Sequence, residues 1–228
     1  MGKENNATHH LKNNLERISS ENSIFNCKSG RKPLLSLGKG NISKWLERLL
    51  PNTRIVIEPK IIGTEVGIQY INGELNKAIN ENSQDITESL MSILNIPKTI
   101  TFKNRLEIRG ILYGDEFTSP KNTHIQFKKV HNSILKIPRP RLCAFQIFHC
   151  NINHFESLQE LKNLNFEIPE THFTNFISDI DIYHQCWKEG KLFTNYPTSG
   201  LVLKINSRKL QKYLGEDNLS INWAYEIN

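Results

Sequence analysis

EPKIIG, residues 58–63, lies between two runs in which apolar residues alternate with others. The alternation covers residues 55–57 before this segment and residues 66–70 after it, and a period of two predicts β-strands. Lys60 would then stand at the end of a strand that carries it into a cleft. A lysine in such a place can attack a phosphate once charge and burial favour its neutral amine. Gly63 would leave room for a ligand beside it.

Length, composition and charge place the chain among globular proteins. Its 228 residues can bury a substantial core, as one large domain or two small ones, and the net charge of +6 permits contact with nucleic acid without requiring it. No apolar run reaches the roughly 18 residues that cross a bilayer, and the first residues contain no apolar signal-peptide core, so we expect no membrane partner. The four cysteines lack metal-binding or C-x-x-C spacing, which predicts free thiols in a reducing cytosol and a cytoplasmic protein.

Two regions differ in composition. Residues 1–30 are rich in Asn, Lys, Ser and Glu and lack apolar periodicity, which predicts a polar, flexible N-terminal arm. Residues 31–228 carry the apolar patterns of one globular domain.

The globular region mixes helix and strand signals. Asn72-Gly73 between alternating runs is the strongest short signal for a β-hairpin. Asn41 is expected to cap one helix, and Asp85 is expected to cap another that runs through Leu94. Because strands and helices follow no regular βαβ alternation, we predict an α+β fold with mainly antiparallel sheets. Further strands are predicted at residues 106–113, 142–149 and 201–205, and further helices at residues 158–164, 182–187 and 210–214.

Six segments, in their order along the chain, are similar to motifs of one family, the adenylation (nucleotidyltransferase) domain of NAD-dependent DNA ligases. Each motif is short, but six in the right order are hard to produce by chance. The segments are PLLSL (33–37) for P-M-L-S-L, EPK (58–60) for E-x-K, DIT (85–87) for the end of G-E-D-I-T, LEIRG (106–110) for L-E-V-R-G, SPKN (119–122) for N-P-R-N and SGLVLK (199–204) for D-G-V-V-I-K.

This resemblance implies a fold and a reaction. The fold would be the antiparallel-sheet α+β domain of covalent nucleotidyltransferases, which is similar to ATP-grasp. In the reaction a lysine attacks the adenylyl phosphate of NAD and releases nicotinamide mononucleotide. The AMP then passes to a DNA 5′-phosphate, a step of DNA repair and replication. The expected ligands are NAD, or AMP or ATP, with Mg²⁺ as a candidate and DNA as a candidate partner.

The resemblance also assigns roles to individual residues. Lys60 would be the adenylated nucleophile, Glu58 would bind the adenine amino group, and Lys204 would hold the α-phosphate. Phe148 would stack on adenine, although considered singly it could be a core residue. No metal-binding set is predicted. The nucleotide-binding residues would be Ser36, Leu37, Glu58, Glu107, Phe148 and Lys204, and the phosphate or nucleic-acid contacts would be Lys121, Lys129 and Lys191.

The chain departs from the family pattern at several positions. Ile62 and Ile111 stand where the family has carboxylates, and Ser199 replaces an aspartate. The family's last lysine falls on Asn228 in an ungapped alignment, or on Glu226 with a two-residue gap. Counterparts of the family's other modules are not recognised, so we expect an isolated and degenerate adenylation domain.

Three hypotheses follow from these matches and departures. The chain could be an adenylating enzyme that forms Lys60–AMP, or a degenerate relative that binds adenine nucleotide or nucleic acid without chemistry. It could also be a basic module that contacts nicked DNA through its lysines and the Arg208–Lys212 cluster. We expect ligase descent, a retained adenosine pocket and impaired adenylation, because metal-assisted transfer needs carboxylates to hold Mg²⁺.

Overall fold

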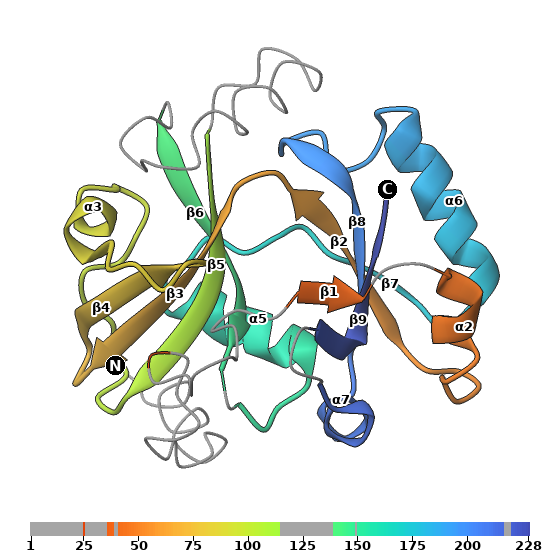
Figure 1. Cartoon of the computed structure of the whole chain (residues 1–228), viewed down its shortest axis with the longest axis horizontal. Helices are drawn as coiled ribbons and strands as arrows, with labels where there is room; N and C mark the ends of the chain where they lie inside the picture. The colour runs from red at the N-terminus through yellow and green to blue at the C-terminus, as the bar shows by residue number, and fades with distance from the viewer. Residues whose placement is uncertain (1–24, 26–35, 39–40, 115–138, 149, 217–219) are drawn as a thin grey trace.

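Two β-sheets lie side by side in the computed structural model, which describes residues 25, 36–38, 41–114, 139–148, 150–216 and 220–228 (Figure 1). The first sheet has the strand order β1-β9-β8-β2-β7. It consists of β1 (Ser36–Gly38), β2 (Ile55–Ile61), β7 (His172–Thr174), β8 (Thr198–Ile205) and β9 (Ser220–Ile227).

The second sheet has the strand order β4-β3-β5-β6. It consists of β3 (Thr64–Ile71), β4 (Glu74–Asn80), β5 (Leu106–Gly114) and β6 (Pro140–Ile147). All strand pairs in both sheets are antiparallel except β1 with β9. The predicted α+β fold with mainly antiparallel sheets is therefore confirmed.

The described residues include five helices, which lie around the two sheets. In Figure 1, α2 and α6 lie outside the five-stranded sheet and α3 lies outside the four-stranded one, with α5 below the middle. None of the described helices is long and apolar enough to cross a membrane. The helices are α2 (Ile42–Leu46), α3 (Thr87–Met91), α5 (His154–Asn163), α6 (Ile177–Lys188) and α7 (Arg208–Leu214).

The hairpin between β3 and β4 forms as the sequence predicts. Asn72 and Gly73 both have positive φ, 53° and 86°, which a two-residue hairpin turn requires. Asn41 also caps α2 as predicted, because its side-chain oxygen accepts hydrogen bonds from the backbone N–H groups of Ser43 and Lys44.

The helix predicted to run from Asp85 through Leu94 is shorter than expected. It ends at Met91, and Leu94 is fully exposed. The chain tightens there, because Ile93 donates its backbone N–H to the carbonyl of Leu90, three residues earlier. Asp85 is not the N-cap, although its carboxylate accepts hydrogen bonds from Thr87.

Gly63 has a different role from the one the sequence predicts. A Cβ atom at this position would lie 2.2 Å from the backbone oxygen of Leu112 and 2.5 Å from Cγ2 of Ile111. Glycine is therefore required by the close approach of β5 where the chain passes from β2 to β3, and no room for a ligand is left beside it.

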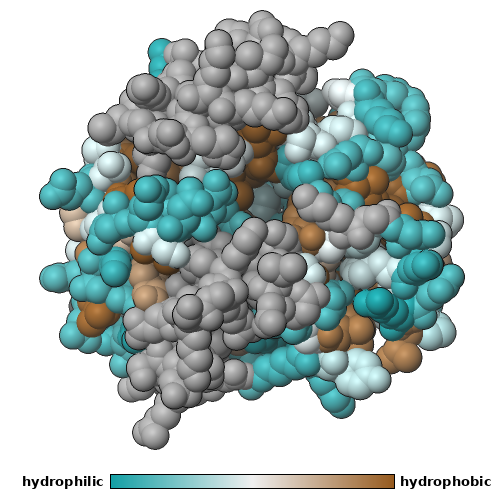
Figure 2. All heavy atoms as spheres, in the orientation of Figure 1, coloured by the Kyte–Doolittle hydropathy of each residue, from teal (hydrophilic) through white to brown (hydrophobic). Residues whose placement is uncertain are grey.

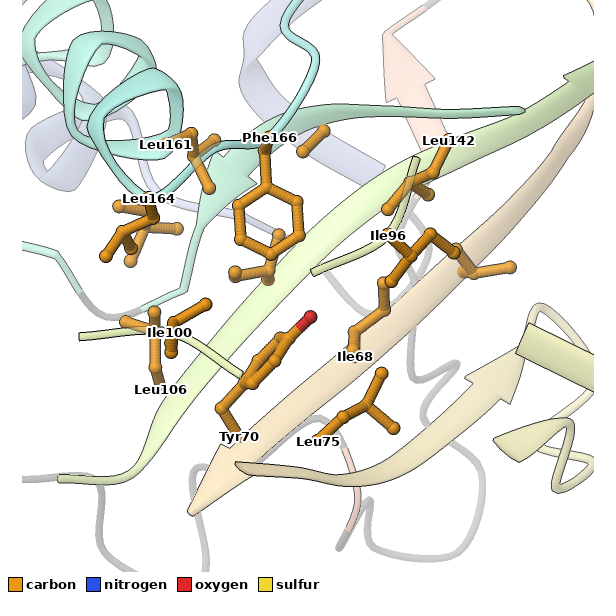
Figure 3. Packing of buried hydrophobic residues seen from close by; sticks show 14 of the residues in the cluster. Ile68, Tyr70, Leu75, Ile96, Ile100, Leu106, Leu142, Leu161, Leu164 and Phe166 are labelled. Atoms are coloured by element: carbon orange, nitrogen blue, oxygen red, sulfur yellow. The ribbon is translucent and has the colours of Figure 1, made fainter. Parts of the chain in front are cut away.

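Each sheet has its own apolar core. The core of the four-stranded sheet gathers residues from the strands and from α5, and Figure 3 shows Tyr70 and Phe166 near its centre. Their rings meet edge to face at 5.9 Å, and the Tyr70 hydroxyl donates to the carbonyl of Pro97. The core of the five-stranded sheet includes the buried side chain of Trp45. These cores fix the strands between which the functional site lies.

Candidate functional site

A cavity of about 250 Å³ opens between the two sheets. We call it the intersheet cavity. On the face that Figure 2 shows, hydrophobic residues come to the surface near the middle, where the two sheets meet in Figure 1. The lining residues are Leu37, Glu58, Pro59, Lys60, Ile61, Glu65, Arg109, Ile111, Cys143, Phe145, Gln146, Pro169, Val202, Lys204, Ile221, Trp223 and Glu226.

Lys60 lies in the wall of this cavity, at the end of β2, where the pairing of β2 with β8 shifts register. Its Nζ donates a hydrogen bond of 2.7 Å to Oδ1 of Asn228 and lies 3.1 Å from Oε2 of Glu226. Asn228 and Glu226 are the two positions on which the family's last lysine falls in the alternative alignments. Both therefore contact Lys60, and neither brings a second positive charge.

Glu58, two residues before Lys60, is fully buried. Its two oxygens lie 2.5 Å from Nε2 of His154 and 2.7 Å from Nζ of Lys204. Burial would raise the pKa of Glu58, but Lys204 and His154 outweigh that effect and lower the pKa from 4.5 to about 2. The carboxylate is thus ionised at neutral pH. Burial also lowers the pKa of His154, which favours its neutral form.

Phe145 lies between two cations of the cavity. The Nζ atom of Lys204 is 4.6 Å from the ring centre, and the guanidinium carbon of Arg109 is 5.5 Å from it. Arg109 is also paired with Glu65 and donates to Oε1 of Gln146. A half-buried aromatic ring beside two positive charges can stack on a base while the cations contact phosphate.

The structure brings some of the predicted site residues together. Leu37, Glu58, Lys60 and Lys204 all line the intersheet cavity. Ser36 belongs to β1, where it is paired with Ser220.

Other predicted residues lie elsewhere. Glu107 is buried outside the cavity lining, where it accepts hydrogen bonds from Arg105 and Gln69. Phe148 lines a different cavity, and Lys191 is exposed beside Glu189. Lys121 and Lys129 fall outside the described residues.

Sequence reasoning missed several residues of the cavity. Cys143 and Phe145 alternate along β6 and both line the cavity, but Gln146, of the other parity, lines it as well. Strand parity therefore does not by itself identify Phe145. No local sequence pattern predicted that His154, Glu65 and Glu226 belong to the site. Each of them is there because it contacts a residue that is distant in the sequence. Of the replaced carboxylates, Ile111 lines the cavity, and Ile62 does not belong to its lining.

The residues of the cavity do not form a binding site for Mg²⁺. Its three carboxylates each face a cation: Glu58 faces Lys204, Glu65 faces Arg109 and Glu226 faces Lys60. A magnesium ion needs oxygen ligands that are not already compensated. In the described part of the chain, no group of three or more His, Cys, Asp or Glu residues could hold a metal ion.

The fold is similar to that of ligase-type nucleotidyltransferase domains. Mycobacterial DNA ligase D complexed with ATP and MES superimposes with a TM-score of 0.51, at 12% identity, over 78% of this chain and 55% of that chain. At this identity the likeness shows the fold alone.

Sequence comparisons find DNA ligases among the relatives of this chain. The model of the NAD-dependent DNA ligase adenylation domain matches residues 22–128. The DNA ligase of Metamycoplasma arthritidis is 28% identical over 93% of this chain, and that of Mesoplasma florum is 26% identical over 84%. The chain spans 38% and 34% of the length of these relatives. The resemblance to the adenylation domain of NAD-dependent DNA ligases is therefore confirmed, at low identity.

Proposed function

We propose that this chain binds an adenine nucleotide in the intersheet cavity and that Lys60 accepts its adenylyl group. One arrangement carries the proposal: Lys60, Arg109 and Lys204 line a single cavity. Three cations beside one cavity suit a ligand with a phosphate chain, and Phe145 offers a ring for its base. The resemblance to DNA ligases makes adenine the expected base.

In the proposed step, the neutral Nζ of Lys60 attacks the α-phosphorus of the donor. A P–N bond forms while the P–O bond to the leaving group breaks, so nicotinamide mononucleotide leaves from NAD, or pyrophosphate from ATP. The proton of Nζ passes to solvent. Arg109 and Lys204 would stabilise the charge that develops on the phosphate oxygens. No step is assigned to Mg²⁺.

Transfer to DNA completes the proposal. An oxygen of a DNA 5′-phosphate would attack the bound adenylyl group, and the P–N bond to Lys60 would break as the new P–O–P linkage forms. The proposal includes a role in DNA repair or replication and a location in the cytoplasm. It also includes a single domain formed by residues 31–228.

A second candidate function is nucleotide binding without chemistry. Two observations favour it: the carboxylate of Glu226 faces Lys60 at 3.1 Å, and Ile111 replaces an oxygen ligand in the wall. A lysine whose amine is held by a carboxylate is less free to attack a phosphate. The same cavity would then serve a regulatory protein that binds adenine nucleotide.

Intact mass spectrometry distinguishes the two functions. The protein is incubated with Mg²⁺ and either NAD or ATP, and an added mass of AMP is expected in the wild type and in Lys188→Ala, an exposed control on α6. Lys60→Ala should give no adduct. Calorimetric titration with AMP accompanies the experiment: binding without adduct favours the second function, and absence of both overturns the proposal.

A further inference from the structure

A second cavity lies beside the first, at the end of β6 and against α7 and β9. We call it the α7 cavity. Its volume is about 260 Å³, close to that of the intersheet cavity, so it can accept a group of similar size. Gln146 and Trp223 line both cavities and form the wall between them. The remaining lining residues are Phe148, Arg208, Gln211, Lys212, Gly215 and Glu216.

Two cations face this cavity from one helix. Arg208 and Lys212 are four residues apart on α7, which puts them on the same side of the helix. The lining contains one carboxylate, Glu216, against these two positive charges. A net positive cavity of this kind favours an anionic ligand.

Among the described residues, the guanidinium of Arg208 forms no ion pair, and its hydrogen-bond acceptor is a neutral amide. Its Nη1 donates a hydrogen bond of 3.2 Å to the amide oxygen of Gln211, and its Nε is buried and makes no hydrogen bond within the described residues. In the intersheet cavity, by contrast, Arg109 is paired with the carboxylate of Glu65. A buried donor without an acceptor costs free energy, and a phosphate beside the guanidinium would offset its charge.

Phe148 adds an aromatic surface to the same cavity. The residue follows β6 directly, is half-buried and belongs to the lining of the cavity. Aromatic rings stack on nucleic-acid bases of any identity, and adjacent cations hold the phosphates. An aromatic ring, an arginine and a lysine around one cavity are thus a combination that suits a nucleotide.

We propose that the α7 cavity binds a nucleotide unit, with its phosphate on Arg208 and its base on Phe148. The site goes beyond the proposed function, because it lies outside the cavity that contains Lys60. The shared chemistry is a phosphate next to a base, and it can come from a single strand of nucleic acid or from a free mononucleotide.

Binding of thymidine ligands to the whole chain tests this site. Thymidine avoids the adenine that the intersheet cavity is expected to take. Anisotropy of a fluorescein-labelled oligothymidylate reports a strand, and calorimetry with dTMP reports a mononucleotide. Arg208→Gln and Phe148→Leu should each weaken binding by about tenfold or more. Lys209→Gln is the matched control, because Lys209 is exposed on the same helix and lies outside the cavity lining.

The outcomes separate the possibilities. The site is supported if Arg208→Gln and Phe148→Leu lose binding while Lys209→Gln retains it. If only the oligonucleotide binds, the ligand is a nucleic-acid strand; if dTMP binds as well, the ligand is a mononucleotide. No binding by the wild type, or an equal loss in Lys209→Gln, overturns it. Lys212→Gln replaces Arg208→Gln if circular dichroism shows that the latter is unfolded. Lys60→Ala should bind thymidine ligands normally, so failure of this site and failure of Lys60 adenylation are told apart.

Discussion

Lys60 and Glu226 form an ion pair between the ends of β2 and β9, with β8 between these two strands in the sheet. The side chain of Glu226 is 8% exposed and that of Lys60 is 24% exposed, so the pair is only partly open to water. The carboxylate holds Nζ of Lys60 against β9, so the amine must leave this contact before it can reach a phosphorus atom. The ion pair is therefore expected to slow the attack of Lys60 on the adenylyl phosphate.

Replacement of Glu226 by glutamine should release this restraint. Without the ion pair, Nζ of Lys60 is held less firmly against β9, and we expect Glu226→Gln to form the AMP adduct about three- to tenfold faster. Time-resolved intact mass spectrometry measures the rate. Glu74→Gln, an exposed change on β4, serves as the control. An unchanged or slower rate in Glu226→Gln would show that the pair positions Lys60 instead of restraining it.

Acidification should remove the stabilisation that Glu58 provides. Its pKa is lowered from 4.5 to about 2, so its contribution is fully present above pH 4.5 and is lost as the pH falls toward 2. We expect Glu58→Gln to lower the free energy of unfolding by about 3 kcal/mol near neutral pH, since it leaves Lys204 buried without its counter-ion. Urea unfolding across this pH range measures the difference between the two proteins. A difference that stays constant with pH would contradict the assignment.

The aromatic partner of the nucleotide can be decided by two parallel substitutions. Phe145→Leu removes the ring from the intersheet cavity, and we expect AMP binding to weaken by about tenfold. Phe148→Leu removes a ring of the same size from the α7 cavity and should leave AMP binding to the intersheet cavity unchanged, even if a second AMP bound in the α7 cavity is lost. Calorimetric titration with AMP checks both variants. The reverse result would restore Phe148 to the role that the sequence resemblance gives it.

Gly63→Ala should destabilise the fold by about 2–4 kcal/mol, because its Cβ would overlap the backbone oxygen of Leu112 at 2.2 Å. Gly190→Ala is the control: its φ is 68°, and a Cβ there would meet nothing within 4 Å. The control should lose only about 1 kcal/mol from backbone strain. Thermal unfolding measures both, and equal losses would mean that the contact with β5 can relax.

The sequence alone determined the local features of this protein. The alternation around residues 55–57 and 66–70 predicts β2 and β3, and Asn72-Gly73 predicts the turn that joins β3 to β4. These signals are readable because strand periodicity and turn chemistry depend on neighbouring residues. The order of six short motifs was enough to indicate the family. Alternation of the buried residues Ile221, Trp223 and Tyr225 also marks β9.

Only the tertiary structure decided which side chains meet. Glu58 and Lys204 are 146 residues apart, and Lys60 and Asn228 are 168 residues apart. Shifts of register in β2 with β8 and in β5 with β6 select the side chains that reach the cavity, and no local pattern predicts them. The partners of Lys60, the choice between Phe145 and Phe148 and the need for Gly63 all follow from the packing of two sheets. Lys60 is therefore recognisable in the sequence, whereas its pairing with Glu226 is a property of the fold.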